Sequence, residues 1–220
     1  MVDVLMNKRK ELVVLLHGIG RTHLSMRPIE KALIKENYHT LNIHYPSRKL
    51  PIEDLATFVF NKIKDFPHYS DFEIHIVSHS MGGIVTRVLL DQYPLPNFKR
   101  IVMLAPPNQG SEVADFFRNS RLYQYFYGPS GQQLSTHYAK ESPFPLIKHE
   151  LGIIAGSLCI EPLSYFLLPK KNDGMVTIES TKLFEMTDHL ILPVTHSFLM
   201  FNKKVIKQII IFLEAGKFKL

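Results

Sequence analysis

The chain has 220 residues, of which 45% are hydrophobic and 21% are charged, a size and balance typical of one globular domain with a single core. Its longest apolar runs, among them Leu12 to Leu16 and Ile209 to Leu213, have five residues each, far fewer than the roughly 20 that cross a bilayer. The sequence therefore predicts no transmembrane helix.

The formal net charge is +6, which favours approach to anionic surfaces such as lipid headgroups or nucleic acid. The basic residues are scattered, however, there is no Trp, and no stretch interleaves basic and aromatic residues, so a nucleic-acid partner is not expected. The densest basic stretch lies near the C-terminus, where lysines flank apolar residues. This pattern allows a peripheral membrane contact, although docking of a last helix on the sheet is the favoured interpretation. These lysines are Lys203, Lys204, Lys207, Lys217 and Lys219.

The opening residues lack the charged start, apolar stretch and small-residue cleavage site of a secretory leader, which predicts a cytoplasmic protein. The single cysteine, Cys159, excludes an internal disulfide and a cysteine-rich metal site. Its neighbours in the segment 155–160 are mostly apolar and predict a buried strand.

Strand-like and helix-like segments alternate along the first half of the chain. In order, we expect a strand at 12–16, a helix at 25–37, a strand at 40–45, a helix at 51–66, a strand at 72–77, a helix at 82–93 and a strand at 100–105.

The periodic pattern lapses between Gly110 and Glu150, and Gly128-Pro129-Ser130-Gly131 interrupts this region. We interpret about 111–150 as a cap or lid inserted into one domain that spans 1–220. Two further strands, at 151–158 and 189–194, and a closing helix at 195–215 complete the prediction.

Strands that alternate with helices imply right-handed crossovers and a mostly parallel sheet with helices on both faces. The predicted fold class is therefore α/β, a three-layer α/β/α sandwich. Ligands of such sheets bind outside the carboxyl ends of the strands, so the turns that follow the apolar runs are where chemistry is expected.

The strongest functional signal is Ser78-His79-Ser80-Met81-Gly82-Gly83, which joins a predicted strand to a predicted helix. A nucleophile on such a sharp turn presents its hydroxyl above the sheet and needs small neighbours two residues away on either side. Ser78 and Gly82 are those neighbours. The helix that follows directs its N-terminal N–H groups at the site, where negative charge develops.

This segment resembles the nucleophile turn of the α/β-hydrolase superfamily, and within it that of small lipases and esterases, which usually reads Gly-x-Ser-x-Gly. Ser78 departs from this pattern because it replaces the first glycine. The resemblance implies that Ser80 is a catalytic nucleophile and that no cofactor or metal is needed.

A serine nucleophile needs a histidine base, and the base needs a carboxylate that fixes its tautomer. In this family the order along the chain is nucleophile, acid, histidine. Asp173, in Asn172-Asp173-Gly174-Met175-Val176, and His196, directly after the last predicted strand, match the positions that the resemblance implies.

Rivals exist for both roles because the chain has eleven histidines. His17 and His79 precede the acid in the sequence, and His189 begins a strand. Glu161 and Asp188 remain open as alternatives to Asp173, which is favoured because Asp-Gly-Met-Val resembles the acid turn of the family.

The resemblance also implies an oxyanion hole, which needs two preorganised donors. We assign one to the backbone N–H of Met81, directly after the nucleophile. The other is assigned to Ile19, in the turn His17-Gly18-Ile19-Gly20 after the first strand.

Two other kinds of site are weighed against this interpretation. Gly18-Ile19-Gly20 partly imitates a dinucleotide fingerprint, but His23 stands where the third glycine belongs and the strand at 40–45 ends without an acidic residue. A zinc site at His75 and His79 fails because four residues along a strand span about 13 Å.

The substrate class is suggested by the insertion, where six aromatic residues could form an apolar wall over the site or a satellite core beneath the cap. They are Phe116, Phe117, Tyr123, Tyr125, Phe126 and Tyr127. The loop at 163–169 could add a second wall, and Ala105 to Ser111 resembles a loop of lipase-like members.

The predicted function is therefore a carboxylic ester hydrolase that acts on a small acyl ester or lipid through an acyl-enzyme. Thioester hydrolysis, acyl transfer and a non-catalytic binding protein of the same fold stay open as alternatives, and the sequence does not determine the oligomeric state.

Overall fold

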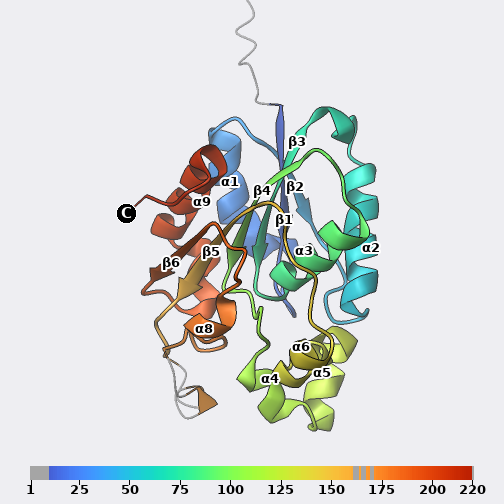
Figure 1. Ribbon diagram of the computed structural model, residues 1–220, viewed down its shortest axis with the longest axis vertical. Coiled ribbons are helices and arrows are strands. Elements are labelled where there is room, and N and C mark those ends of the chain that lie inside the picture. Colours follow the sequence, from blue (N-terminus) through green and yellow to red (C-terminus); the bar gives the residue numbers. More distant parts are fainter. Residues whose placement is uncertain (1–9, 161–163, 165–166, 169–170, 220) are drawn as a thin grey trace, which may run out of the picture.

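The structure, a computed structural model, describes residues 10–160, 164, 167–168 and 171–219. Six strands form one parallel sheet in the order β2-β1-β3-β4-β5-β6 (Figure 1). The strands are β1 (Glu11–Leu16), β2 (His39–Ile43), β3 (Glu73–His79), β4 (Phe98–Leu104), β5 (Glu150–Gly156) and β6 (Asp188–Leu192). The predicted α/β class and parallel sheet are confirmed.

Helices cover both faces of the sheet, which gives three layers (Figure 1). Helices α1 (Arg27–Lys35) and α9 (Lys203–Ala215) pack on one face, and α2 (Ile52–Lys64) and α3 (Met81–Gln92) pack on the other. Every residue of β1 from Leu12 to Leu16 is fully buried, because a strand between two helical layers buries both of its faces. Burial of each such side chain contributes about 1.5–3 kcal/mol.

The prediction of one continuous closing helix at 195–215 is wrong. A 3₁₀ helix, η3 (His196–Phe201), comes first, and α9 starts only at Lys203. The reason is Asn202, whose side-chain oxygen accepts hydrogen bonds from the N–H groups of Lys204 and Val205, at 2.9 and 3.2 Å. This N-cap begins a new helix. The predicted helix at 25–37 likewise starts as a 3₁₀ helix, η1 (His23–Met26); another short one, η2 (Tyr69–Asp71), precedes β3.

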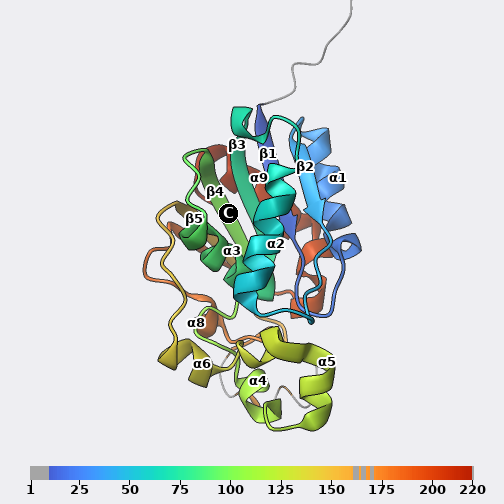
Figure 2. The same cartoon turned by 90° about the vertical axis from the view of Figure 1, so that its right-hand side faces the viewer.

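The region between β4 and β5 contains three short helices below the carboxyl ends of the strands (Figures 1 and 2). They are α4 (Glu112–Phe117), α5 (Arg121–Gln132) and α6 (Thr136–Glu141). Gly128 kinks α5 with φ 60° and ψ −159°, at the point where the Gly-Pro-Ser-Gly segment interrupts the sequence pattern. Another short helix, α8 (Ile178–Thr181), lies between β5 and β6.

Cys159 does not lie in a buried strand, so that prediction is wrong. β5 ends at Gly156, and the side chains of Leu158 and Ile160 on either side of the cysteine are 45% and 63% exposed. The apolar run extends beyond the strand because the chain leaves the sheet there. Of the loop predicted at 163–169, Ser164, Leu167 and Leu168 are described and the other positions lie outside the described residues. None of the helices in the described part of the chain has the length and apolar character that a membrane span requires.

Candidate active site

Ser80 lies on the turn between β3 and α3 and has φ 54° and ψ −126°, a conformation that costs an ordinary residue about 1–3 kcal/mol. The surrounding structure holds it there. The Ser80 N–H donates to the Leu104 carbonyl of β4 at 2.8 Å, and the Ser80 carbonyl accepts from the Gly83 N–H at 2.8 Å. A Cβ on Gly82 would lie 2.8 Å from the Leu16 carbonyl oxygen, so the turn needs glycine at that position.

Asp173 and His196 meet at the carboxyl end of β5 and β6. His196 Nδ1 lies 2.8 Å from Asp173 Oδ2, and the His196 N–H donates to the Asp173 carbonyl at 2.8 Å. The Asp173 side chain is 1% exposed. Its Oδ1 accepts hydrogen bonds from the N–H groups of Met175 and Val176, at 3.0 and 2.9 Å. Three hydrogen bonds thus satisfy the carboxylate of Asp173, as its burial requires. Because His196 contacts Asp173 through Nδ1, its Nε2 is left for another partner.

The rival residues lie elsewhere or have other contacts. Asp188 begins β6, at the amino ends of the strands and away from His196, and accepts hydrogen bonds from the N–H groups of His189 and Phe218. Glu161 lies outside the described residues. His189 Nε2 pairs with the Thr181 hydroxyl at 3.0 Å.

His17 is fully buried and stacks on the ring of Tyr45, whose hydroxyl donates to the His17 carbonyl. Burial lowers the pKa of His17 to about 4. The residue therefore stays neutral and fixes the end of β1, next to the turn that carries Ile19.

His79 contacts the base directly, which the sequence pattern does not indicate. The two rings lie 4.8 Å apart between centroids, and His79 Nε2 lies 3.1 Å from the His196 carbonyl oxygen. Burial, followed by electrostatic repulsion from His196 and Arg21, holds the pKa of His79 well below its usual range. A neutral His79 that donates from Nε2 holds the backbone of His196 in place.

The two assigned oxyanion donors lie at the ends of neighbouring strands, since β1 pairs with β3. Met81 is the first residue of α3, where the N–H has no acceptor inside the helix. A hydrogen bond from the Arg21 N–H to the Gly18 carbonyl, at 3.2 Å, closes a turn with Ile19 and Gly20 at its centre. This bond joins the Arg21 N–H to the Gly18 carbonyl, so the N–H of Ile19 takes no part in it.

Ser80, His196 and Ile19 line one cavity of about 650 Å³. Asp173 lies behind His196, and the side chain of Met81 is buried in the core. Most of the other lining side chains are apolar or aromatic, and four of the six aromatic residues predicted for the insertion are among them. Those four are Phe117, Tyr123, Phe126 and Tyr127, whereas Phe116 and Tyr125 are 61% and 82% exposed.

Several lining residues were missed by the sequence analysis, among them Arg48, Val113 and Leu134. Arg48 comes from the loop between β2 and α2, where the pattern of prolines indicates only a turn. Val113 and Leu134 lie in the region without a clear period. No signal in a single sequence joins these segments, because the contacts between them are long-range.

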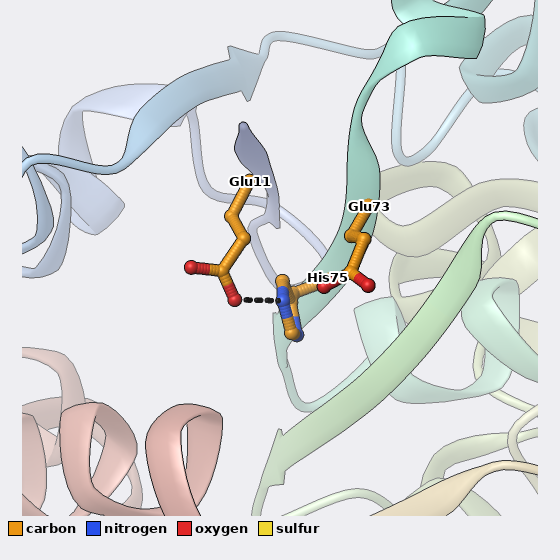
Figure 3. A group of neighbouring side chains, drawn as sticks. All are labelled: Glu11, Glu73 and His75. Carbon is orange, nitrogen blue, oxygen red and sulfur yellow. Dashed lines mark hydrogen bonds and ion pairs between the residues drawn. The ribbon is translucent and has the colours of Figure 1, made fainter. Parts of the chain in front are cut away.

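A separate cluster lies at the amino ends of β1 and β3, at the end of the sheet away from Ser80 (Figure 3). One carboxylate oxygen of Glu11, one of Glu73 and a ring nitrogen of His75 lie within 4.8 Å of one another. His75 Nε2 contacts Glu11 Oε1 at 3.2 Å. The carboxylate of Glu73 is paired with the ammonium group of Lys99. These contacts are a hydrogen bond between β1 and β3 and an ion pair between β3 and β4. His79 has no part in them, because it lies at the carboxyl end of β3.

Comparison with solved structures relates the fold to those of known enzymes. The mature form of the lipase BlEst2 from Bacillus licheniformis has a TM-score of 0.76 and 18% identity, over 96% of this chain and 93% of that chain. The metagenomic carboxyl esterase MGS0156 has a TM-score of 0.73 and 17% identity, over 86% of this chain and 65% of that chain. The phospholipase PlaB from Legionella pneumophila has a TM-score of 0.58 and 17% identity, over 78% and 45%.

These similarities show an α/β-hydrolase fold of the lipase and esterase type, as the nucleophile turn predicts. No curated protein sequence matches the chain. Residues 5–129 match the family described as "Domain of unknown function (DUF7379)", and because the match covers more than half of the 220 residues, the chain belongs to this family.

Proposed function

We propose that the protein is a serine hydrolase that cleaves carboxylic esters with Ser80, His196 and Asp173 as its triad. The observation that carries the proposal is the buried hydrogen bond between Asp173 and His196, next to a cavity that His196 and the strained Ser80 both line. A buried carboxylate on Nδ1 sets the tautomer in which Nε2 accepts a proton.

In the proposed reaction His196 Nε2 takes the proton of the Ser80 hydroxyl while Oγ attacks the ester carbonyl. The N–H groups of Ile19 and Met81 stabilise the oxyanion. The intermediate collapses to an acyl-enzyme as His196 returns the proton to the leaving alcohol. Water then attacks the acyl group by the same proton transfers, which releases the acid and restores Ser80.

The proposed substrate is an acyl ester or a lipid. An apolar cavity of about 650 Å³ falls within the range of small-molecule sites. We propose that helices α4 to α6 act as a cap of the single domain, because Phe117, Tyr123 and Phe126 contribute to the wall of the cavity. An acyl chain would bury its methylene groups there, at about 0.8 kcal/mol each.

The nucleophile is tested by labelling with a fluorophosphonate probe, which reacts with activated serines. We expect the wild type to be labelled and Ser80→Ala to lose both labelling and at least about 10³-fold in kcat. Ser120→Ala is the matched control, because Ser120 also lines the cavity and should leave labelling intact.

Labelling that persists in Ser80→Ala would contradict the assignment of the nucleophile. A folded wild type without labelling would favour the non-catalytic binding protein. With labelling established, turnover of matched oxygen esters and thioesters, with water or an added alcohol as acceptor, separates the ester hydrolase from a thioesterase or an acyltransferase.

The acyl preference is tested with a series of chromogenic esters. We expect kcat/KM to rise from acetyl to octanoyl, because the longer chain reaches the apolar wall formed by Phe117 and Phe126. A preference for acetyl would contradict a cavity that accommodates an acyl chain.

A further inference from the structure

One strongly basic residue is found among the described residues that line the cavity. Among these described residues Arg48 is the one with a charged side chain of the Asp, Glu, Lys or Arg type. Apart from His196, the others are apolar, aromatic, hydroxyl-bearing or glycine. No described lining carboxylate is present to neutralise it. An anion that enters the cavity would therefore find one guanidinium and no acidic group in the described wall.

Arg48 lies in the loop between β2 and α2, where that loop contacts α5. It is exposed, and its Nη1 donates a hydrogen bond to the Phe126 carbonyl of α5 at 3.2 Å. A guanidinium carries five N–H donors in a planar fork, so this bond leaves most of the fork for another acceptor. Such a fork binds phosphate or carboxylate oxygens in a bidentate manner.

Resting on the proposed ester hydrolase, we infer that the substrate carries an anionic headgroup, a phosphate or a carboxylate, that Arg48 binds. Ser80 and His196 mark the position of the ester carbonyl, and Phe117 and Leu134 offer an apolar surface for the acyl chain. In this inference the acyl chain packs on Phe117 and Leu134, and Arg48 binds a charge on the alcohol part of the ester. The substrate class is an acyl ester of an anionic alcohol, with an acylated glycerol phosphate as the simplest case.

A purely structural role would also explain an arginine at this position. The Arg48 carbonyl packs so closely on Gly128 that a Cβ there would lie 1.8 Å from its oxygen, and Ser130 donates to the Ser47 carbonyl at 2.6 Å. Arg48 could therefore serve only to fasten α5 to the core. That role predicts an equal effect on neutral and anionic substrates, whereas headgroup binding predicts an effect that depends on substrate charge.

The experiment compares octanoylglycerol with octanoylglycerol phosphate in the wild type, Arg48→Gln and Arg48→Lys. Gln keeps an N–H donor for the Phe126 carbonyl but has no charge. We expect Arg48→Gln to lower kcat/KM about 10-fold for the phosphate ester, mainly through KM, and less than about 2-fold for the neutral ester. Arg48→Lys should restore part of the difference. Lys49→Gln is the control, because Lys49 is exposed and does not line the cavity.

An equal loss for both esters, or no loss for either, would overturn the inference. An octanoyl ester of a hydroxy acid in the same assay shows whether a carboxylate replaces the phosphate. Binding of octyl phosphate and octanol to Ser80→Ala separates this inference from the proposed function. Binding of octyl phosphate that depends on Arg48 supports the anion site even without any hydrolysis, and binding that is unchanged in Arg48→Gln rejects it.

Discussion

Ser78 replaces the first glycine of the usual nucleophile turn, and the structure shows what this replacement costs. Its side chain is fully buried in β3, and its Oγ has no hydrogen-bond partner among the described residues. A buried hydroxyl without a partner costs about 1–3 kcal/mol. The turn itself keeps its shape, because the strained residue is Ser80 and not Ser78.

We predict that Ser78→Ala raises the free energy of unfolding by about 1 kcal/mol, because it removes the unsatisfied hydroxyl and creates little space. Urea unfolding measures this change, and Ser70→Ala, at an exposed position, should have almost no effect. A loss of more than about 1 kcal/mol would mean that the hydroxyl has a hydrogen-bond partner, such as a buried water molecule.

Local patterns and contacts between distant residues differ in how far the sequence predicts them. Ser80, Asp173 and His196 could be proposed from a short motif, the order of residues along the chain and the ends of predicted strands. The contact of His79 with His196 joins residues 117 positions apart, and the placement of Arg48 at the cavity depends on a helix that the sequence pattern does not show. Both depend on tertiary packing.

The same difference appears in the secondary-structure elements. β1 and β4 each contain a buried, continuous apolar run, Leu12 to Leu16 and Ile101 to Leu104, and these runs predicted both strands. Helix α5 was missed because its aromatic residues divide between the cavity, as for Phe126, and solvent, as for Tyr125, which is 82% exposed. No single apolar stripe results, so the helical period is hidden.

At the end of β5, Gly156 sets the distance between that strand and the proposed acid. A Cβ at this position would lie 2.4 Å from the Val194 carbonyl oxygen and 2.7 Å from Asp173 Cβ. We predict that Gly156→Ala displaces Asp173 and lowers kcat about 10- to 100-fold, because catalysis is sensitive to displacements near 1 Å. Steady-state kinetics per active site, titrated with the fluorophosphonate, measure the effect.

Gly152→Ala is the matched control for this variant. It lies four residues earlier on the same face of β5, and its Cβ would lie 2.6 Å from the ring of Phe212 in α9. We expect it to lower stability and to leave kcat per active site unchanged. Equal effects of both variants on kcat would show that Gly156 acts only through stability.

The molecule as a whole buries several histidines in the neutral form. His17 and His79 are 0% and 1% exposed, and burial lowers both pKa values, to about 4 for His17. In the unfolded chain each histidine titrates near 6.5. Between these pH values the unfolded state binds more protons than the folded state, so stability rises with pH.

We predict that the free energy of unfolding is highest above about pH 6.5 and falls as the pH drops toward 4. Each such histidine contributes a slope of up to about 1.4 kcal/mol per pH unit. Urea unfolding at several pH values should show a smaller slope for His17→Gln than for the wild type. His68→Asn, at an exposed position, should keep the wild-type slope, and parallel curves for His17→Gln and the wild type would contradict the prediction.

The strand order has a consequence for how the protein acquires activity during synthesis. From β3 onward, each new strand joins the same edge of the sheet, first β4, then β5, then β6. Strands that leave the ribosome in that order could add to the edge one after another. Under the proposed triad the serine turn is made early and its base last, because His196 follows β6. We expect a nascent chain to carry an unreactive serine until the final strand is in place.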